Sequence, residues 1–284
     1  MEEAIRKADV LIEALPYIKR FHKKVTVIKY GGSILGDDRI RHSVLEDIIF
    51  LSYIGMRVVL VHGGGPKISD RMRISGKKND FIEGMRVTDE ETLRVVEEEL
   101  NTLNSLIVKE IAELGGKVEG FSGKENNLIQ VKKKKASIDL GLVGEIINID
   151  REFLLSKLRN DEILVICPMG ISHDNKVYNV NADEAAFWIS HALEAEKFVL
   201  LTNVRGIMRH TEDPGSLLSS LTIEESGNLI KDNVIQEGMI PKVNACVQAI
   251  NKGVNKAHII DARIPHALLL EIFTDAGIGT EIVK

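Results

Sequence analysis

Two short apolar segments of this chain each run directly into a cluster of glycines. Val25–Tyr30 (VTVIKY) is followed by Gly31-Gly32, and Arg57–His62 (RVVLVH) by Gly63-Gly64-Gly65. Short, β-branched segments of this kind are typical of buried strands. In an open parallel sheet, ligands bind outside the carboxyl ends of the strands, where glycines let backbone N–H groups approach a phosphate or a carboxylate. The two clusters therefore predict an anion-binding site at one edge of a parallel sheet.

Strand-like and helix-like segments alternate along the chain. The hydrophobic periodicity predicts further strands over 163–167, 198–202 and 257–260, and helices over 40–54, 88–114 and 182–193. Thr88 and Glu91 have the spacing of a capping box, which predicts that the long helix begins at Thr88. This alternation predicts an α/β fold with a mainly parallel sheet covered by helices on both faces.

The first twenty residues have a helical pattern of their own. Apolar residues recur at spacings of three and four, among them Leu11, Ile12 and Leu15, and predict an amphipathic helix over 3–22. Pro16 lies inside this pattern and predicts a kink or a break there.

Composition excludes several classes of protein. The chain has 284 residues and a formal net charge of −5, which disfavours non-specific nucleic-acid binding. The lysine run at 132–135 is interpreted as a solvated loop, because no wider basic field supports it. No apolar run reaches the roughly 18–20 residues of a membrane helix, and two cysteines cannot form a disulfide framework. The expectation is a cytoplasmic protein without a membrane or nucleic-acid partner.

Two lysines lie beside glycine turns. Lys29 is inside the first strand-like segment, where a charge is unfavourable unless it faces a partner or a ligand. Lys242 follows Gly238 in the sequence GMIPK, just before a predicted helix, and could equally be a solvated surface lysine.

Other polar residues near these turns each have an ordinary structural interpretation. Asp183 could simply compensate the charge of a helix N-terminus, and Asn179 and Asn181 are typical turn residues. Arg86 could be a surface arginine, and His62 is interpreted as a packed, hydrogen-bonded residue. There is no GxxxxGK[ST] motif, no strand-linked GxGxxG and no spaced His/Cys cluster, so no protein-bound transition metal is predicted.

The order of these motifs resembles the N-acetyl-L-glutamate kinases of the amino acid kinase family. The resemblance runs from about residue 10 to the C-terminus and rests on five motifs: Lys29-Tyr30-Gly31-Gly32-Ser33, Val61-His62-Gly63-Gly64-Gly65-Pro66, Gly84-Met85-Arg86-Val87-Thr88-Asp89, Tyr178-Asn179-Val180-Asn181-Ala182-Asp183 and Gly238-Met239-Ile240-Pro241-Lys242-Val243. Such an ordered set is far more specific than any one motif alone.

The resemblance implies a three-layer αβα sandwich with two lobes on one continuous, mainly parallel sheet. An N-terminal helix (1–24) would precede a substrate lobe (25–180) and a nucleotide lobe (181–284). The implied activity is transfer of the γ-phosphoryl group of ATP, with Mg²⁺, to the side-chain carboxylate of N-acetyl-L-glutamate in arginine biosynthesis. That carboxylate, with a pKa of about 4.3, needs no catalytic base, so the task is positioning and charge stabilisation.

The resemblance also implies roles for individual residues. Lys29 and Lys242 would be the transition-state cations, and Asp183 would orient both ammonium groups. The other implied contacts are phosphate or nucleotide at Gly31, Gly32, Thr202 and Asn203, and substrate at Gly64, Gly65, Arg86, Asn179 and Asn181. Mg²⁺ would be held by phosphates and water rather than by protein ligands.

The N-terminal helix resembles that of arginine-inhibited, hexameric members. Tyr17, Glu271 and Gly279 match positions near which arginine binds in those enzymes. The resemblance implies feedback inhibition by L-arginine and a homo-oligomer, a dimer or a trimer of dimers. A helix that only caps the fold is the alternative.

Three positions depart from the family pattern. Asn203 replaces the aspartate of Thr-Asp-Val, Glu237 replaces the first glycine of a Gly-Gly pair, and Asn101-Thr102 replaces Gly-Lys in the long helix. Two alternatives therefore stay open: a related amino acid kinase that uses another carboxylate, and a non-catalytic sensor of arginine or nucleotide.

Overall fold

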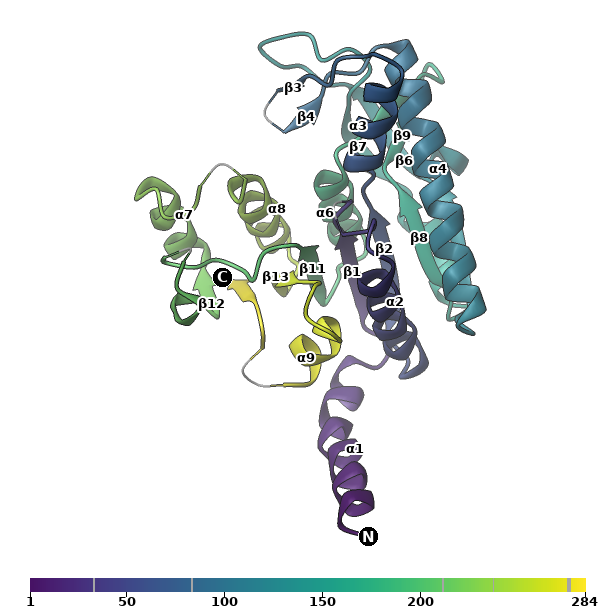
Figure 1. Ribbon diagram of the computed structural model, residues 1–284. Coiled ribbons are helices and arrows are strands. Elements are labelled where there is room, and N and C mark those ends of the chain that lie inside the picture. Colours follow the sequence, from purple (N-terminus) through teal and green to yellow (C-terminus); the bar gives the residue numbers. More distant parts are fainter. Residues whose placement is uncertain (33, 83, 211, 237, 275–276) are drawn as a thin grey trace.

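The computed structural model describes residues 1–32, 34–82, 84–210, 212–236, 238–274 and 277–284 (Figure 1). The helices of these residues are α1 (Glu2–Phe21), α2 (Asp38–Tyr53), α3 (Gly65–Ile74), α4 (Glu90–Glu113), α5 (Arg151–Leu158), α6 (Ala182–Ala192), α7 (Ile223–Lys231), α8 (Ile240–Asn251) and α9 (Ala267–Phe273). The strands are β1 (Val25–Tyr30), β2 (Arg57–His62), β3 (Phe81–Ile82), β4 (Met85–Arg86), β5 (Val118–Ser122), β6 (Ile129–Lys133), β7 (Gly144–Ile149), β8 (Ile163–Cys167), β9 (Met169–Ile171), β10 (Val177–Asn179), β11 (Lys197–Thr202), β12 (Ser220–Thr222), β13 (Lys256–Asp261) and β14 (Thr280–Val283).

A mainly parallel sheet runs through the molecule in the order β12-β14-β13-β11-β1-β2-β8-β5. Within it, β13 and β14 pair antiparallel, while β1 lies parallel between β11 and β2. Strands from the first and the second half of the chain thus meet at the β1–β11 pair. The strands predicted at β1, β2 and β8 are confirmed with their predicted bounds.

The side chains of β1 alternate between two cores, one on each face of the sheet. Val25 and Val27 belong to a core that also contains residues of α6 and α8. Ile28 and Tyr30 belong to a second core with residues of α2, α4 and α9. Apolar residues on both faces of the central strands explain why helices cover the sheet on both sides and form three layers (Figure 1).

A four-stranded sheet (β10-β9-β6-β7) and the β3–β4 hairpin extend one end of the structure. The lysine run begins on β6, where Lys132 pairs with Glu145 at 3.1 Å and Lys133 with Asp139 at 2.8 Å. Lys134 pairs with Glu184 at 2.7 Å. Since neighbouring carboxylates neutralise these lysines, the run does not form a free basic surface.

The N-cap of the long helix lies one residue later than its sequence predicts. Asp89, not Thr88, caps α4, because the Asp89 side chain accepts a hydrogen bond from the Thr92 backbone N–H at 2.7 Å. Thr88 is drawn into a bridge with Gly141, and its hydroxyl donates to the Arg86 carbonyl at 2.8 Å. The predicted capping box at Thr88 is therefore wrong, because a tertiary contact uses that threonine.

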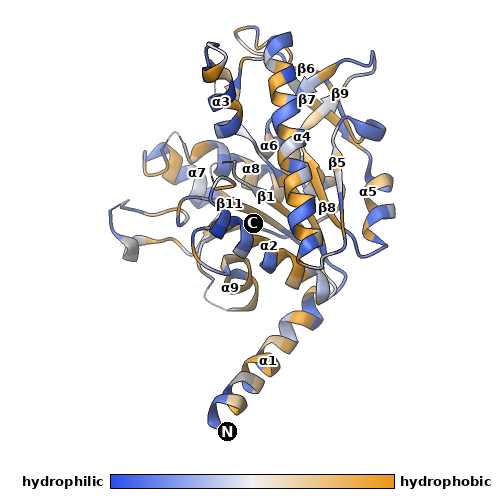
Figure 2. Ribbon diagram, turned by 45° about the vertical axis from the view of Figure 1, so that its right-hand side comes forward, coloured by the Kyte–Doolittle hydropathy of each residue, from blue (hydrophilic) through white to orange (hydrophobic). Residues whose placement is uncertain are grey.

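The N-terminal helix projects away from the other elements (Figure 1). It runs without a break through Pro16, so the predicted break is not found. Leu11 and Ile12 are each 68% exposed, and Leu15 is 42% exposed, so part of the predicted apolar stripe faces outward (Figure 2). Among the described residues, no helix combines the length and apolar character needed to cross a membrane.

Candidate functional site

The two glycine clusters pack against each other at one end of the sheet. Parallel pairing sets Tyr30 opposite His62, so the residues that follow these two strands become neighbours. A Cβ atom on Gly32 would lie 3.2 Å from the Gly64 nitrogen and 3.0 Å from the Gly65 nitrogen. A side chain at Gly32 would press on these backbone nitrogens, and the space next to the N–H groups is suited to an anion.

The two packed glycine clusters form a cradle for an anion, and Lys29 and Asp183 form an ion pair beside it. Lys29 follows Val25 and Val27 on the sheet face that α6 covers, and Asp183 lies in the first turn of α6. The strand alternation and the helix start therefore bring their charges together, with Lys29 Nζ 2.8 Å from Asp183 Oδ1. Both side chains are mostly buried, with 11% and 18% exposed.

Lys242 adds a second cation from the other half of the chain. It lies in the first turn of α8, and its ammonium donates to the Gly238 carbonyl at 3.1 Å. Burial alone would raise the pKa of the Asp183 carboxyl, but Lys29 and Lys242 outweigh that effect and hold the pKa below its ordinary value. Burial lowers the pKa of Lys242, and Lys29 lowers it further while Asp183 opposes both. The three charges thus act on one another.

A first cavity, of about 320 Å³, opens beside the cradle. Its polar lining includes Lys29, Gly64, Gly65, Arg86, Asn179, Asn181 and Asp183. The structure therefore brings together residues from four separate segments that the sequence analysis had singled out. The adjacent hairpin places the Phe81 ring against Arg86, with the guanidinium carbon 4.5 Å from the ring centroid.

Arg86 presents a nearly buried cation to the first cavity. The side chain is 6% exposed and donates to the Gly65 carbonyl at 3.2 Å, to Ser69 Oγ at 2.8 Å and to Asn79 Oδ1. Burial lowers its pKa. No carboxylate forms a salt bridge with Arg86 among the described residues. A buried arginine held by neutral acceptors favours an anionic ligand.

Three of the predicted contact residues already have partners in the fold. The Asn181 side-chain oxygen caps α6 by accepting from the Asp183 and Glu184 backbone N–H groups, at 2.8 and 3.1 Å. Asn179 donates to Thr88 Oγ1 at 3.2 Å. The Gly31 N–H donates to the Leu201 carbonyl at 3.1 Å, so in this structure it is not the phosphate-facing group that was predicted. Gly32 lines the cavity instead.

A second cavity, of about 400 Å³, lies in the other half of the chain. Asn203, Gly238 and Lys242 line it together with apolar side chains: Val204, Ile207, Met208, Val234, Ile235 and Met239. Thr202 is buried beside it, and its hydroxyl donates to the Val204 carbonyl at 3.0 Å. The departure at Glu237 lies outside the described residues.

A third cavity, of about 250 Å³, lies between α1 and the C-terminal segment. Two of the three residues that the sequence suggested for a regulatory site, Tyr17 and Glu271, line this cavity. Gly279 does not line it, but its N–H lies 3.3 Å from Glu271 Oε2 and holds that carboxylate in place. Tyr17 also packs edge-on against Phe273 of α9, with ring centroids 6.1 Å apart.

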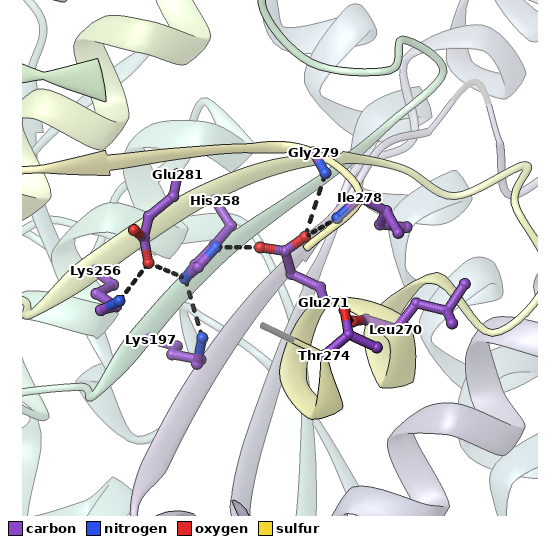
Figure 3. Close-up of polar contacts among 9 residues, drawn as sticks. All are labelled: Lys197, Lys256, His258, Leu270, Glu271, Thr274, Ile278, Gly279 and Glu281. Atoms are coloured by element: carbon purple, nitrogen blue, oxygen red, sulfur yellow. Dashed lines mark hydrogen bonds and ion pairs between the residues drawn. The ribbon is translucent and has the colours of Figure 1, made fainter. Parts of the chain in front are cut away.

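Figure 3 shows a polar network whose charged side chains line this third cavity. Glu271 accepts from His258 Nδ1 at 2.7 Å, and His258 Nε2 lies 3.2 Å from Lys197 Nζ. Glu281 continues the network to Lys256. Burial lowers the pKa of Lys197 to about 8. Sequence reasoning missed Lys197, although a lysine at the start of an apolar strand was a signal like that of Lys29.

The described residues contain no group of three or more His, Cys, Asp or Glu side chains that could hold a metal ion. In the described part of the chain, Cys167 and Cys246 are free and buried.

The profile of the amino acid kinase family matches residues 24–261. An acetylglutamate kinase of Petrotoga mobilis is 47% identical over 99% of this chain and 95% of its own length. This chain belongs to the amino acid kinase family, among the acetylglutamate kinases. An acetylglutamate kinase of Heliobacterium modesticaldum is 45% identical, with both chains fully covered.

Solved structures of N-acetylglutamate synthase from Neisseria gonorrhoeae have the same fold as this family member. The complex with coenzyme A and N-acetyl-glutamate is 27% identical, with a TM-score of 0.88 over 98% of this chain. The complex with coenzyme A and L-arginine is 25% identical, with a TM-score of 0.84. This chain spans 63% and 65% of those two synthase chains, so the likeness concerns only part of that protein.

Proposed function

We propose that this chain transfers the γ-phosphoryl group of ATP to the side-chain carboxylate of N-acetyl-L-glutamate, releasing ADP and an acyl phosphate. The observation that carries the proposal is the Lys29–Asp183–Lys242 group. Lys29 and Asp183 line the first cavity and Lys242 lines the second. A positive group of this kind, with one lysine in each cavity, suits a reaction in which a phosphoryl group passes between two anions.

The acceptor would lie in the first cavity. Its side-chain carboxylate would approach the Gly64 and Gly65 N–H groups, and its α-carboxylate would pair with Arg86. These contacts hold the acceptor close to the transferring phosphoryl group, which lowers the entropic part of the barrier. No proton has to be removed, because the carboxylate is already ionised at neutral pH.

The nucleotide would lie in the second cavity, with its phosphates directed towards Lys242. The apolar side chains there suit a purine ring, and the Gly32 cradle suits the phosphate end. Mg²⁺ would be held by the phosphates and water, since Asp183 is already paired with Lys29. Bound Mg²⁺ would neutralise phosphate charge. We place the reaction in the cytoplasm, where it would draw on cellular ATP.

Coupled ADP release with MgATP tests this proposal. Turnover is expected with N-acetyl-L-glutamate and much less with free L-glutamate or N-acetyl-L-aspartate. If another carboxylate is preferred, the related amino acid kinase is the better assignment. If ATP binds without turnover on any acceptor, the sensor alternative replaces the kinase.

The third cavity supports a regulatory proposal in which L-arginine inhibits the enzyme. A free amino acid with a guanidinium group matches a cavity that contains carboxylates (Glu271, Glu281) and the Lys197 ammonium group. Tyr17 lines the same cavity, so a ligand there would contact α1 and the nucleotide half together. The exposed apolar side chains of α1 support an oligomer in which this helix contacts another subunit.

Arginine titration and solution mass measurements test these two regulatory claims. Millimolar arginine should suppress ADP release, and Tyr17→Ala should raise the half-inhibitory concentration at least several-fold with little effect on uninhibited turnover. Sedimentation should give a hexamer, and Leu11→Glu/Leu15→Glu should give dimers. An unchanged rate in arginine, or a dimeric wild-type protein, would contradict the corresponding claim.

A further inference from the structure

Two buried polar side chains lie directly behind the second glycine cluster, which is Gly63–Gly65. His62 is fully buried, and Asn104 of α4 is 8% exposed. Asn104 Nδ2 lies 3.2 Å from His62 Nε2 and 3.0 Å from the Val165 carbonyl oxygen of β8. Neither side chain lines the first cavity, so any effect they have on a ligand must pass through the glycines.

The chemistry of these contacts determines which atom of His62 carries the proton. The Val165 carbonyl can only accept, so the atom of Asn104 that faces it must be the amide nitrogen. The second hydrogen of this nitrogen is directed at His62 Nε2, which must therefore be the nitrogen with the lone pair. The proton is then on Nδ1, which lies 3.4 Å from the Gly63 carbonyl oxygen. Burial lowers the pKa of His62 to about 4, so the ring stays neutral at physiological pH.

This arrangement orients the peptide group between Gly63 and Gly64. In a trans peptide the carbonyl and the following N–H point in opposite directions. With the Gly63 carbonyl held towards His62, the Gly64 N–H points away from the ring. On that side lies Gly32, where a Cβ atom would be 3.2 Å from the Gly64 nitrogen. Helix α4 also closes the back of the loop, because a Cβ on Gly64 would lie 2.9 Å from Leu100 Cδ2.

We infer that Asn104 is a positioning residue that acts through His62 to aim the Gly64 N–H at the acceptor carboxylate. This inference rests on the proposed function, since it concerns the same first cavity. It assigns a role to a side chain that touches neither substrate. Asn104 holds the His62 tautomer, the tautomer holds the Gly63 carbonyl, and the peptide plane sets the direction of the Gly64 N–H.

The kinetic test compares Asn104→Ala with Asn101→Ala, the same substitution one turn earlier on α4. Asn101 is exposed, and its recorded contact is with the Cys167 thiol at 3.7 Å. Asn104→Ala should raise KM for N-acetyl-L-glutamate about tenfold, as expected for losing a buried hydrogen bond, while KM for ATP stays within twofold. Asn101→Ala should change neither constant. Equal losses in both constants for Asn104→Ala, or only a lower Tm, would overturn the inference.

A second variant, Gly120→Ala, perturbs the Asn104 side chain without replacing Asn104 itself. A Cβ on Gly120 would clash with Asn104 Oδ1, so the amide would have to move while His62 remains unchanged in sequence. The same selective rise in KM for N-acetyl-L-glutamate is expected. An unchanged KM together with a changed His62 tautomer would overturn the inference, because the tautomer would then have no control over the Gly64 N–H.

The wild-type protein provides a test that needs neither a variant nor turnover. Nitrogen-15 NMR of the histidine rings should show His62 as the neutral Nδ1–H tautomer from pH 6 to 8. A neutral Nε2–H tautomer, or an imidazolium, would overturn the inference even if the kinase is active. If the wild type does not phosphorylate N-acetyl-L-glutamate, the proposed function fails, and this tautomer alone decides whether the Gly63 peptide is held as described.

Discussion

The first and second cavities each contain one lysine of the Lys29–Asp183–Lys242 group, but the rest of their linings differ. The first is lined by glycine backbone, by Arg86 and by the Lys29–Asp183 pair as well as by apolar side chains, and it is more polar than the second. The second has mostly apolar side chains, with Asn203, Gln236 and Lys242 as its polar exceptions. Recognition in the first cavity depends on charge and on the direction of backbone N–H groups. Recognition in the second depends on shape and apolar contact. A small dianion and a purine nucleotide make those two different demands.

The largest expected effect concerns the two lysines, one in the lining of each cavity. Lys29→Ala and Lys242→Ala should each lower kcat by about a hundredfold or more, because each removes a preorganised positive charge from the transition state. Steady-state kinetics measures this, and Lys231→Ala on the exposed surface of α7 is the control. Near-normal turnover in either site variant would contradict the proposal that both lysines stabilise a phosphoryl group passing between the cavities.

A second substitution separates the cavities from each other. Arg86→Ala should raise KM for N-acetyl-L-glutamate by about 10–100-fold, since a charge-assisted contact is worth about 1.5–3 kcal/mol. KM for ATP should stay within twofold, and Arg39→Ala on the surface of α2 should change neither constant. A larger effect on ATP than on the acceptor would reverse the assignment of the two cavities.

The buried histidine behind the first cavity should leave a pH signature in stability. Burial lowers the pKa of His62 from 6.5 to about 4, so between these values the unfolded chain binds a proton that the folded chain does not. The free energy of unfolding should therefore fall as pH falls through this window, by at most about 1.4 kcal/mol per pH unit from this group.

Urea titrations at several pH values measure that slope. His62→Gln should flatten it, whereas His173→Gln, an exposed histidine between β9 and β10, should leave it unchanged. An equally steep slope in both variants would assign the pH dependence to other groups, such as His258, whose pKa burial also lowers.

The smallest expected effect belongs to the second cavity. Asn203→Asp replaces a neutral amide with the carboxylate typical of the family, and a carboxylate accepts stronger hydrogen bonds from hydroxyl donors. KM for ATP should fall about threefold, and KM for N-acetyl-L-glutamate should not change. A rise in KM for ATP would instead show that added negative charge repels the phosphates.

The sequence was a good guide wherever structure depended on nearby residues. The bounds of β1, β2 and β8 followed from short buried runs that end at Gly31, at Gly63 and at Pro168. It was a poorer guide at the start of α4, because Thr88 and Asp89 are both good capping residues. A bridge to Gly141, far away in the chain, uses the threonine and leaves the cap to Asp89.

The same limit applies to the candidate site. The sequence identified Lys29, Asp183 and Lys242 as a group only through resemblance, and it interpreted His62 as an ordinary packed residue. Asn104 carried no signal at all, since an amide in a long amphipathic helix is unremarkable. Its role depends on the Val165 carbonyl and the His62 ring, which come from two other elements.

By itself, the sequence determined the alternation of strands and helices, the glycine turns after β1 and β2, and the charge on the residues beside them. These features depend on side-chain size, backbone freedom and periodicity over a few residues. Only the tertiary structure decided that Lys29 pairs with Asp183 and that Arg86 is buried among neutral acceptors. It also decided that the Gly31 N–H donates to the Leu201 carbonyl. Such pairings depend on which elements pack together, and that is a property of the whole chain.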